Sequence, residues 1–191
     1  MLLLTTALQR ELNPDEITPQ LTKINPLEGD ELLICPRSSE SIREVPDLML
    51  LAALRIWRKT NRSKIVFCGT HNQALGLQSL ADAMNREHPE SARVILPDSI
   101  SALVQIISQA GAVLGVDSAP AHIATALDKH TVVIGGGGTF GMCFPWQRSD
   151  RQKLVANQIP CYGCGWHCTQ PEVSCLTGIT AEQIAEAIPT L

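Results

Sequence analysis

Short apolar runs alternate with helix-length segments along most of this chain, and this alternation constrains its fold more than any other feature. Five runs have the length and the β-branched content of buried strands. They cover residues 32–35, 64–68, 93–96, 113–116 and 131–134. Parallel strands need a crossover between them, which is usually a helix. The order of the segments therefore predicts an α/β fold, with a parallel sheet covered by helices on both faces.

The segments between the runs carry signals for helix ends. Asp47 predicts the cap of the first helix, and two more helices are expected over residues 99–110 and 120–127. In the last helix Thr180 is followed three places later by Gln183, which is the pattern of a capping box. A further helix is expected between the second and third strands, from the helical spacing of its leucines.

Length and composition indicate an ordinary soluble domain. The chain has 191 residues, of which 45% are hydrophobic, and its net charge of −4 favours neither nucleic acid nor an anionic membrane surface as a partner. The apolar start, residues 1–4, is too short for a signal core or a membrane span. We expect a cytoplasmic protein without a transmembrane segment. Residues 1–30 are predicted to form a helix followed by a proline-rich linker, and residues 31–191 the domain.

The segment Asp117–His122 directly follows the fourth apolar run, and it predicts a phosphate site. A helix that begins here, with Pro120 near its first position, leaves backbone N–H groups facing the end of the strand, where the helix dipole favours an anion. Asp117 is interpreted as a structural acid that caps the turn. An ordinary helix N-cap beside a surface histidine is the alternative.

Loops after the other runs are expected at the same edge of the sheet, because parallel sheets place ligands at the carboxyl ends of their strands. The loop after the first run, residues 36–44, offers serine hydroxyls and two guanidinium groups, those of Arg37 and Arg43, which suit phosphate. A glycine run, residues 135–138, follows the fifth strand.

Four of the seven cysteines are clustered in a segment rich in small and polar residues, and they predict a four-cysteine finger over residues 160–176. They are Cys161, Cys164, Cys168 and Cys175. Two close pairs of thiolates can close a tetrahedral site around structural zinc or iron. Two disulfides and free thiols are the alternatives, and His167 is a substitute ligand in a minor version of the metal site.

Over residues 30–190 the chain resembles glycosyltransferase family 9, the heptosyltransferase type, which uses ADP-heptose or related donors. The resemblance is carried by the Asp-Ser-Ala-Pro-Ala-His segment at 117–122, by residues 126–135, and by Pro-Arg-Ser-Ser at 36–39 followed by Arg43. In this chain Ala119 and Arg37 replace glycines of the family pattern, and Arg43 replaces a lysine.

The resemblance implies a Rossmann-like domain, the C-terminal half of a GT-B glycosyltransferase, that binds the nucleotide-sugar donor as substrate. The residues that it assigns to the donor are Ser38, Ser39, Arg43, Asp117, Ser118, Ala119, Pro120, Ala121, His122, Gly135 and Gly136. It also implies iron in the four-cysteine finger, as in autotransporter heptosyltransferases. No catalytic residue is assigned, because the family's general base belongs to a preceding domain.

Two functions follow as alternatives. The first is the donor-binding half of an inverting glycosyltransferase, active with an N-terminal domain or a partner chain. The second is a non-catalytic nucleotide-sugar-binding or assembly module. The expected partners are a nucleotide-diphosphate sugar, the missing domain and a second copy of the chain.

Overall fold

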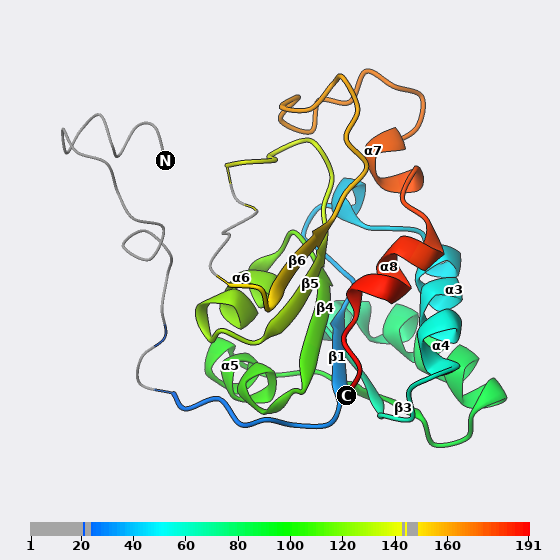
Figure 1. The fold of residues 1–191 in the computed structure, drawn as a ribbon, viewed down its shortest axis with the longest axis vertical. Coiled ribbons are helices and arrows are strands. Elements are labelled where there is room, and N and C mark those ends of the chain that lie inside the picture. Colours follow the sequence, from blue (N-terminus) through cyan, green and yellow to red (C-terminus); the bar gives the residue numbers. More distant parts are fainter. Residues whose placement is uncertain (1–20, 22–23, 143, 145–148) are drawn as a thin grey trace.

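The computed structural model describes residues 21, 24–142, 144 and 149–191 (Figure 1). The helix predicted at the start of the chain lies outside these residues. Leu21 and residues 24–30 come before the first strand and run along the bottom of the sheet in Figure 1. The N–H of Leu21 donates to the carbonyl of Ala126 at 3.1 Å, and that of Leu27 to the carbonyl of Ser108 at 2.9 Å. These bonds tie the segment to the helices beside it.

A six-stranded sheet forms the centre of the molecule, in the order β3-β2-β1-β4-β5-β6, and every neighbouring pair is parallel. The strands are β1 (Leu32–Cys35), β2 (Ile65–Cys68), β3 (Ala92–Ile95), β4 (Ala112–Val116), β5 (His130–Ile134) and β6 (Gln152–Val155). The first five confirm the predicted strands to within one residue at each end. Strand β6 was not predicted, because it lies at the sheet edge and buries only Val155.

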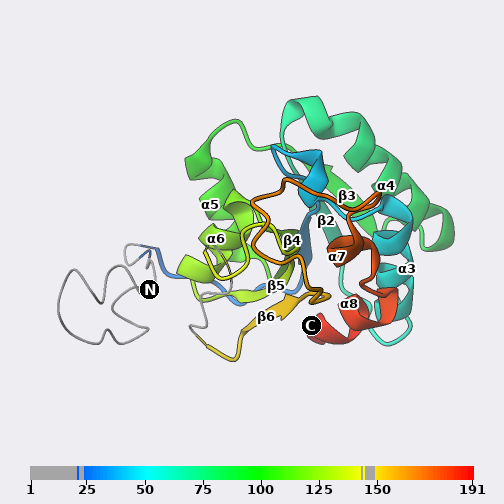
Figure 2. The same cartoon turned by 90° about the horizontal axis from the view of Figure 1, so that it is seen from above.

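Helices cover both faces of the sheet, as predicted (Figure 2). One face carries α3 (Asp47–Arg58), α4 (Ala74–Glu87), α7 (Ser174–Thr177) and α8 (Ala181–Ala187), and the other carries α5 (Ile100–Gln109) and α6 (Ala119–Ala126). Alternate residues of each strand serve the two layers. In β1, Leu32 and Ile34 pack with the first layer, whereas Leu33 and Cys35 pack with the second. This is the α/β Rossmann-like arrangement.

The strand order changes direction at β1, so that β1 and β4 are neighbours at the switch point of the sheet. From β1 the chain adds β2 and β3 on one side, and it then returns to place β4, β5 and β6 on the other. The loops after β1 and β4 therefore leave the sheet in opposite directions and open a crevice between them. The fold alone makes this crevice the place to look for a ligand.

Side chains cap the starts of two helices, and the second cap, at Thr180, confirms the predicted capping box. Ser99 caps α5, and its Oγ accepts a hydrogen bond from the N–H of Ala102 at 3.1 Å. Before α8, the N–H of Gln183 donates to Thr180 Oγ1 at 3.2 Å, and the N–H of Thr180 donates to Gln183 Oε1 at 2.8 Å. The capping box is complete, and it fixes the helix that packs against α3.

The cap predicted at Asp47 is wrong by one residue. Pro46 occupies the N-cap position of α3, and Asp47 is the first residue of the helix. Its carboxylate accepts hydrogen bonds from Arg37 instead of from the helix backbone. The Asp47 side chain therefore pairs with Arg37 from the loop after β1, and it does not cap the helix as the local sequence predicts.

Within the described ranges, no helix is both long enough and apolar enough to cross a membrane.

Replacing Thr180 with alanine is expected to lower the free energy of unfolding by about 1 kcal/mol, because the N-cap acceptor of α8 is lost. Urea denaturation followed by circular dichroism measures the change. The exposed Thr190 supplies the matched control, since Thr190→Ala removes the same atoms without removing a cap. Equal losses in the two variants would show that the capping box does not stabilise the helix.

Candidate functional site

A cavity of about 540 Å³ lies at the crevice between β1 and β4, and we call it the switch-point cavity. Residues after the carboxyl ends of β1, β2, β3 and β4 line it. Six of the predicted donor residues are among them, namely Ser38, Ser39, Arg43, Ser118, Ala119 and Pro120. The structure thus brings together two loops that are separated by about 80 positions in the sequence, as their places after neighbouring strands imply.

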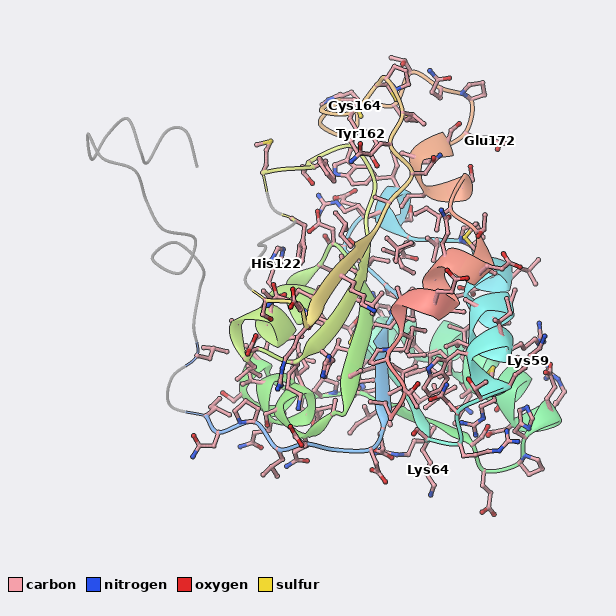
Figure 3. The ribbon with its side chains drawn as sticks, in the orientation of Figure 1. Lys59, Lys64, His122, Tyr162, Cys164 and Glu172 are labelled. Atoms are coloured by element: carbon pink, nitrogen blue, oxygen red, sulfur yellow. The ribbon has the colours of Figure 1, made fainter. Side chains whose placement is uncertain are left out.

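The remaining predicted donor residues are not part of the lining. They are Asp117, Ala121, His122, Gly135 and Gly136. Ala121 is fully buried and packs with Val133 and Phe144. Asp117 and His122 contact each other beside α6, where Figure 3 labels His122.

Two further walls of the cavity hold none of the residues that were predicted to bind the donor. Gly69, Thr70 and Gln73 contribute from the loop after β2, and residues 97–100 contribute from the loop after β3. The rule that parallel strands place ligand loops at their carboxyl ends applies equally to both loops. That rule was the available signal, but neither loop carries a lysine or an arginine that would have singled it out as a phosphate site.

Two buried cysteines, Cys35 and Cys68, end neighbouring strands and also line the cavity. They pack in the core beneath α5 and α6, and in addition they form part of the cavity wall. The hydrogen-bonding contact with Cys68, together with burial, raises the pKa of Cys35 well above its ordinary value. The same contact lowers the pKa of Cys68. At this part of the wall the cavity is lined by two thiol side chains and not by charged groups.

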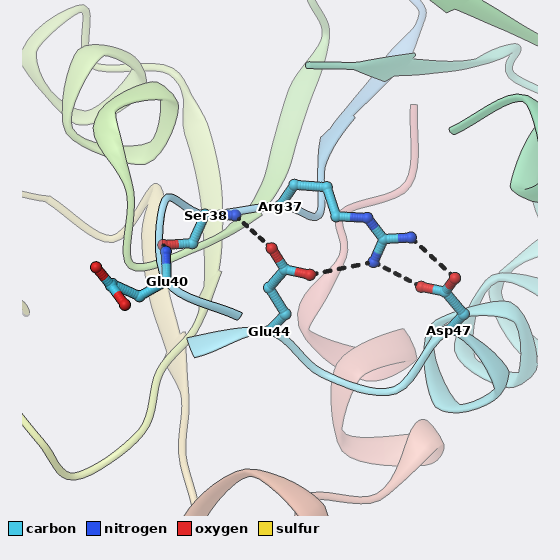
Figure 4. Close-up of polar contacts among 5 residues, drawn as sticks. All are labelled: Arg37, Ser38, Glu40, Glu44 and Asp47. Atoms are coloured by element: carbon cyan, nitrogen blue, oxygen red, sulfur yellow. Dashed lines mark hydrogen bonds and ion pairs between the residues drawn. The ribbon is translucent and has the colours of Figure 1, made fainter. Parts of the chain in front are cut away.

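The two arginines of the β1 loop have different surroundings, and Figure 4 shows those of Arg37. Its Nη1 and Nη2 donate to the two carboxylate oxygens of Asp47 at 2.7 and 2.8 Å, and Nη1 also lies 3.5 Å from Glu44 Oε2. The bond to Asp47 raises the pKa of Arg37. Glu44 in turn accepts a hydrogen bond from the N–H of Ser38 at 2.8 Å. Arg37 therefore braces the loop, and its guanidinium is already engaged by carboxylates.

Helix α6 begins at the cavity with Ser118 as its N-cap residue. The Ser118 side chain makes no capping bond, and its Oγ lies 3.4 Å from the carbonyl oxygen of Val116. The Ser118 carbonyl accepts the N–H of Ala121 at 3.0 Å, and Pro120 has no N–H to offer. The N–H groups of Ser118 and Ala119 lie at the start of the helix, where no intrahelical acceptor is available. A hydroxyl and the positive end of a helix dipole thus face the cavity.

Asp117 does not cap the turn as predicted, since Ser118 holds the N-cap position. One carboxylate oxygen of Asp117 lies 3.3 Å from His122 Nε2, and the other accepts a hydrogen bond from Thr139 Oγ1 at 3.0 Å. The contact with His122 lowers the pKa of Asp117 most, and the bond from Thr139 also lowers it, against the effect of burial. Asp117 therefore ties the start of α6 to the loop after β5.

Two aromatic rings, those of Tyr162 and Trp166, pack against the glycine run (residues 135–138) that follows β5. A Cβ atom on Gly137 would lie 2.3 Å from Tyr162 Cδ2, and one on Gly138 would lie 2.3 Å from Trp166 Cδ2. At Gly136 the same atom would lie 2.6 Å from Trp166 Cη2. Side chains at these three positions would occupy the space that the rings fill, which is why the run has none.

Backbone hydrogen bonds join the same two segments. The N–H of Gly163 donates to the carbonyl of Gly137 at 2.7 Å, and that of Gly165 to the carbonyl of Gly138 at 2.9 Å. Gly163 and Gly165 have φ of 86° and 60°, in the left-handed region that glycine tolerates. The cysteine segment, residues 160–176, is thus docked on the glycine run.

The predicted tetrahedral set of four cysteines is not confirmed. Among the described residues, no three or more histidine, cysteine, aspartate or glutamate side chains gather as a metal site. The Cys175 side chain is buried at the start of α7, facing Gly136, whereas Cys168 is exposed and its thiol points to the carbonyls of Gln170 and Glu172. Figure 3 shows Cys164 and Tyr162 at one side of the segment and Glu172 at the other. As placed, the thiols do not fit one ion, and all four are free.

Gly137→Ala is expected to lower the free energy of unfolding by about 1–3 kcal/mol, because the new methyl group overlaps the Tyr162 ring. Gly76→Ala is the matched control. Gly76 lies in α4, where a Cβ atom would come no closer than 3.4 Å to its nearest neighbour, Arg37, and alanine favours the helix. Thermal unfolding of both variants checks the prediction, which fails if Gly137→Ala is as stable as the wild type.

Because the pKa of Asp117 is lowered in the folded protein, the contribution of this carboxyl to the free energy of unfolding depends on pH. A carboxyl with a lower pKa in the folded state stabilises the fold fully above its unfolded pKa, about 3.9, and loses this effect as the pH falls through the folded value. Asp117→Asn should therefore lower stability at pH 7 and flatten its decline below about pH 4. Urea midpoints between pH 2.5 and 7 measure this. Parallel curves for the two proteins would contradict the assignment.

Comparison with known proteins identifies the fold's relatives. Residues 8–168 match the sequence profile of glycosyltransferase family 9 (heptosyltransferase). A comparison with curated protein sequences found no match. Among solved structures, E. coli ADP-heptose LPS heptosyltransferase II aligns with a TM-score of 0.64 at 19% identity, over 84% of this chain and 45% of that chain.

Two other E. coli structures share the fold. Heptosyltransferase WaaC with ADP aligns with a TM-score of 0.60 at 16% identity, over 89% of this chain and 45% of that chain. The iron-containing dodecameric glycosyltransferase TibC from enterotoxigenic E. coli aligns with a TM-score of 0.56 at 16% identity, over 88% and 47%. The chain spans about half the length of these proteins. The family profile covers most of the sequence, and the chain belongs to glycosyltransferase family 9, the heptosyltransferase family.

Proposed function

We propose that residues 31–191 form the donor-binding half of an inverting glycosyltransferase, and that the switch-point cavity holds the diphosphate of a nucleotide sugar. One observation carries the proposal. The β1 loop and the start of α6, which the sequence assigns independently to an anion, meet at one cavity between β1 and β4. Doubly wound sheets bind nucleotides at this place in the fold.

The chemistry of the lining supports a phosphate group. Arg43 supplies a permanent positive charge with several N–H donors, and Ser39 and Ser118 supply hydroxyls. The first N–H groups of α6 add the positive end of a helix dipole. Each such term is worth about 0.3–1 kcal/mol when exposed, so the donors must act together.

The relatives suggest the identity of the nucleotide. WaaC is known with ADP and with ADP-2-deoxy-2-fluoro heptose, and TibC with ADP-D-β-D-heptose. We therefore propose an ADP-sugar of the heptose kind as the donor. In glycosyl transfer the leaving group is a nucleoside diphosphate, whose developing charge these donors would stabilise.

Acceptor binding and proton removal are assigned to a different part of the enzyme. The chain corresponds to about half of each relative, so the proposal gives it donor binding and leaving-group stabilisation only. The base that activates the acceptor hydroxyl would come from an N-terminal domain or a partner chain.

Ser118→Asp is expected to abolish ADP binding, because it places a carboxylate where the proposal puts a phosphate. Isothermal titration of the full chain with ADP measures the affinity. Ser79→Asp is the matched control, since it makes the same charge change on the exposed side of α4, away from the cavity. Unchanged ADP affinity in folded Ser118→Asp protein, or no ADP binding by the wild type, would overturn the proposal.

A further inference from the structure

Both arginines of the β1 loop line the switch-point cavity, and Arg43 is held differently from Arg37. Arg43 closes the short helix Ser41–Arg43, and among the described residues no carboxylate forms an ion pair with it. The nearby Asp117 carboxylate interacts with Arg43 only through charge, which lowers the pKa of Asp117 slightly further. The partner of Arg43 is an aromatic ring, because its Cζ lies 5.8 Å from the centroid of Trp166. Its Nε is buried and has no hydrogen-bond acceptor in the part of the chain that the structure describes.

Trp166 comes from the cysteine segment, more than 120 residues further along the chain. Its ring lies against Gly136 and Gly138, where no side chain can compete for the space. Its backbone has φ of 66°, a conformation that costs energy in a residue other than glycine. The bond from the Gly165 N–H to the Gly138 carbonyl fixes the segment one residue earlier. The fold thus holds the indole firmly on the glycine run, beside Arg43.

An aromatic ring and a carboxylate affect a guanidinium in different ways. A carboxylate neutralises the charge and uses the N–H donors, as Asp47 does for Arg37. An aromatic ring attracts the cation through its face and leaves the donors at the edge of the guanidinium unused. Restricting a long side chain in advance also reduces the ordering cost of binding a ligand.

We propose that Trp166 is a positioning residue, which holds the Arg43 guanidinium oriented without engaging its N–H donors, so that they can bind the phosphate groups of the ligand in the switch-point cavity. The proposal rests on the proposed donor site and deepens it. It gives the cysteine segment a role in donor affinity that depends on its tryptophan and its docking on the glycine run.

A double-mutant cycle on the full chain tests this, with ADP affinity measured by titration calorimetry. Trp166→Leu should weaken ADP binding about 5-fold, the size of a partly desolvated cation–π contact. Arg43→Met should weaken it more. In the Arg43→Met background, Trp166→Leu should have no further effect, because its effect passes through Arg43. Equal losses in both backgrounds would overturn the proposal.

Two further variants separate positioning from general stability. Tyr162→Leu removes the neighbouring ring from the glycine run, so it should lower the melting temperature while leaving ADP affinity within about 2-fold, since its partner is Gly137 rather than Arg43. Trp166→Phe keeps an aromatic face and should retain most of the affinity. A loss of affinity in Tyr162→Leu as large as in Trp166→Leu would contradict the specific role of Trp166.

Fluorinated tryptophan provides a test that does not depend on the folding of Trp166→Leu. Fluorine withdraws density from the ring face with little change of shape, so ADP affinity should fall stepwise as fluorine atoms are added. All three tryptophans are labelled, and Arg43→Met is therefore the control, in which the series should be flat. A flat series in the wild type refutes the Trp166 proposal alone. If Arg43→Met and Ser118→Asp both bind ADP normally, the donor site itself is refuted.

Discussion

The pairing of β4 with β1 is the constraint on which the rest of the molecule depends. Four residue pairs, from Leu32 with Ala112 to Cys35 with Gly115, join strands that lie 80 positions apart. This pairing puts β2 and β3 on one side and β5 and β6 on the other, so the loops after β1 and β4 must diverge. The cavity exists because no crossover helix fills the space between those two loops.

A second contact, between the glycine run and the cysteine segment, completes the carboxyl edge of the sheet. Aromatic rings fill the space that glycine leaves open, and two backbone hydrogen bonds hold the segments together. This gives the glycines a packing role beside the phosphate role proposed for Gly135 and Gly136 from the sequence. The cysteine segment contributes through Tyr162 and Trp166, and the four thiols do not converge.

The surroundings of Arg37 and Arg43 explain why residue type alone could not assign their roles. Both arginines belong to one loop, and both have the chemistry to bind phosphate. Asp47, at the start of α3, engages Arg37, whereas Arg43 meets an aromatic ring from the far end of the chain. The role of Arg43 depends on Trp166, which is remote in sequence. The role of Arg37 depends on Asp47, whose side chain is aimed by the packing of α3.

The sequence by itself determined the parallel sheet, its first five strands, the capping box at Thr180, and the two loops that meet at the cavity, because these depend on local periodicity and hydrogen-bonding chemistry. Only the tertiary structure decided the edge strand β6, the true partner of Asp47, the separation of Cys168 from Cys175, and the place of Trp166 beside Arg43. The physical reason is that each of these depends on a surface supplied by another part of the chain, whose distance and direction no local pattern encodes.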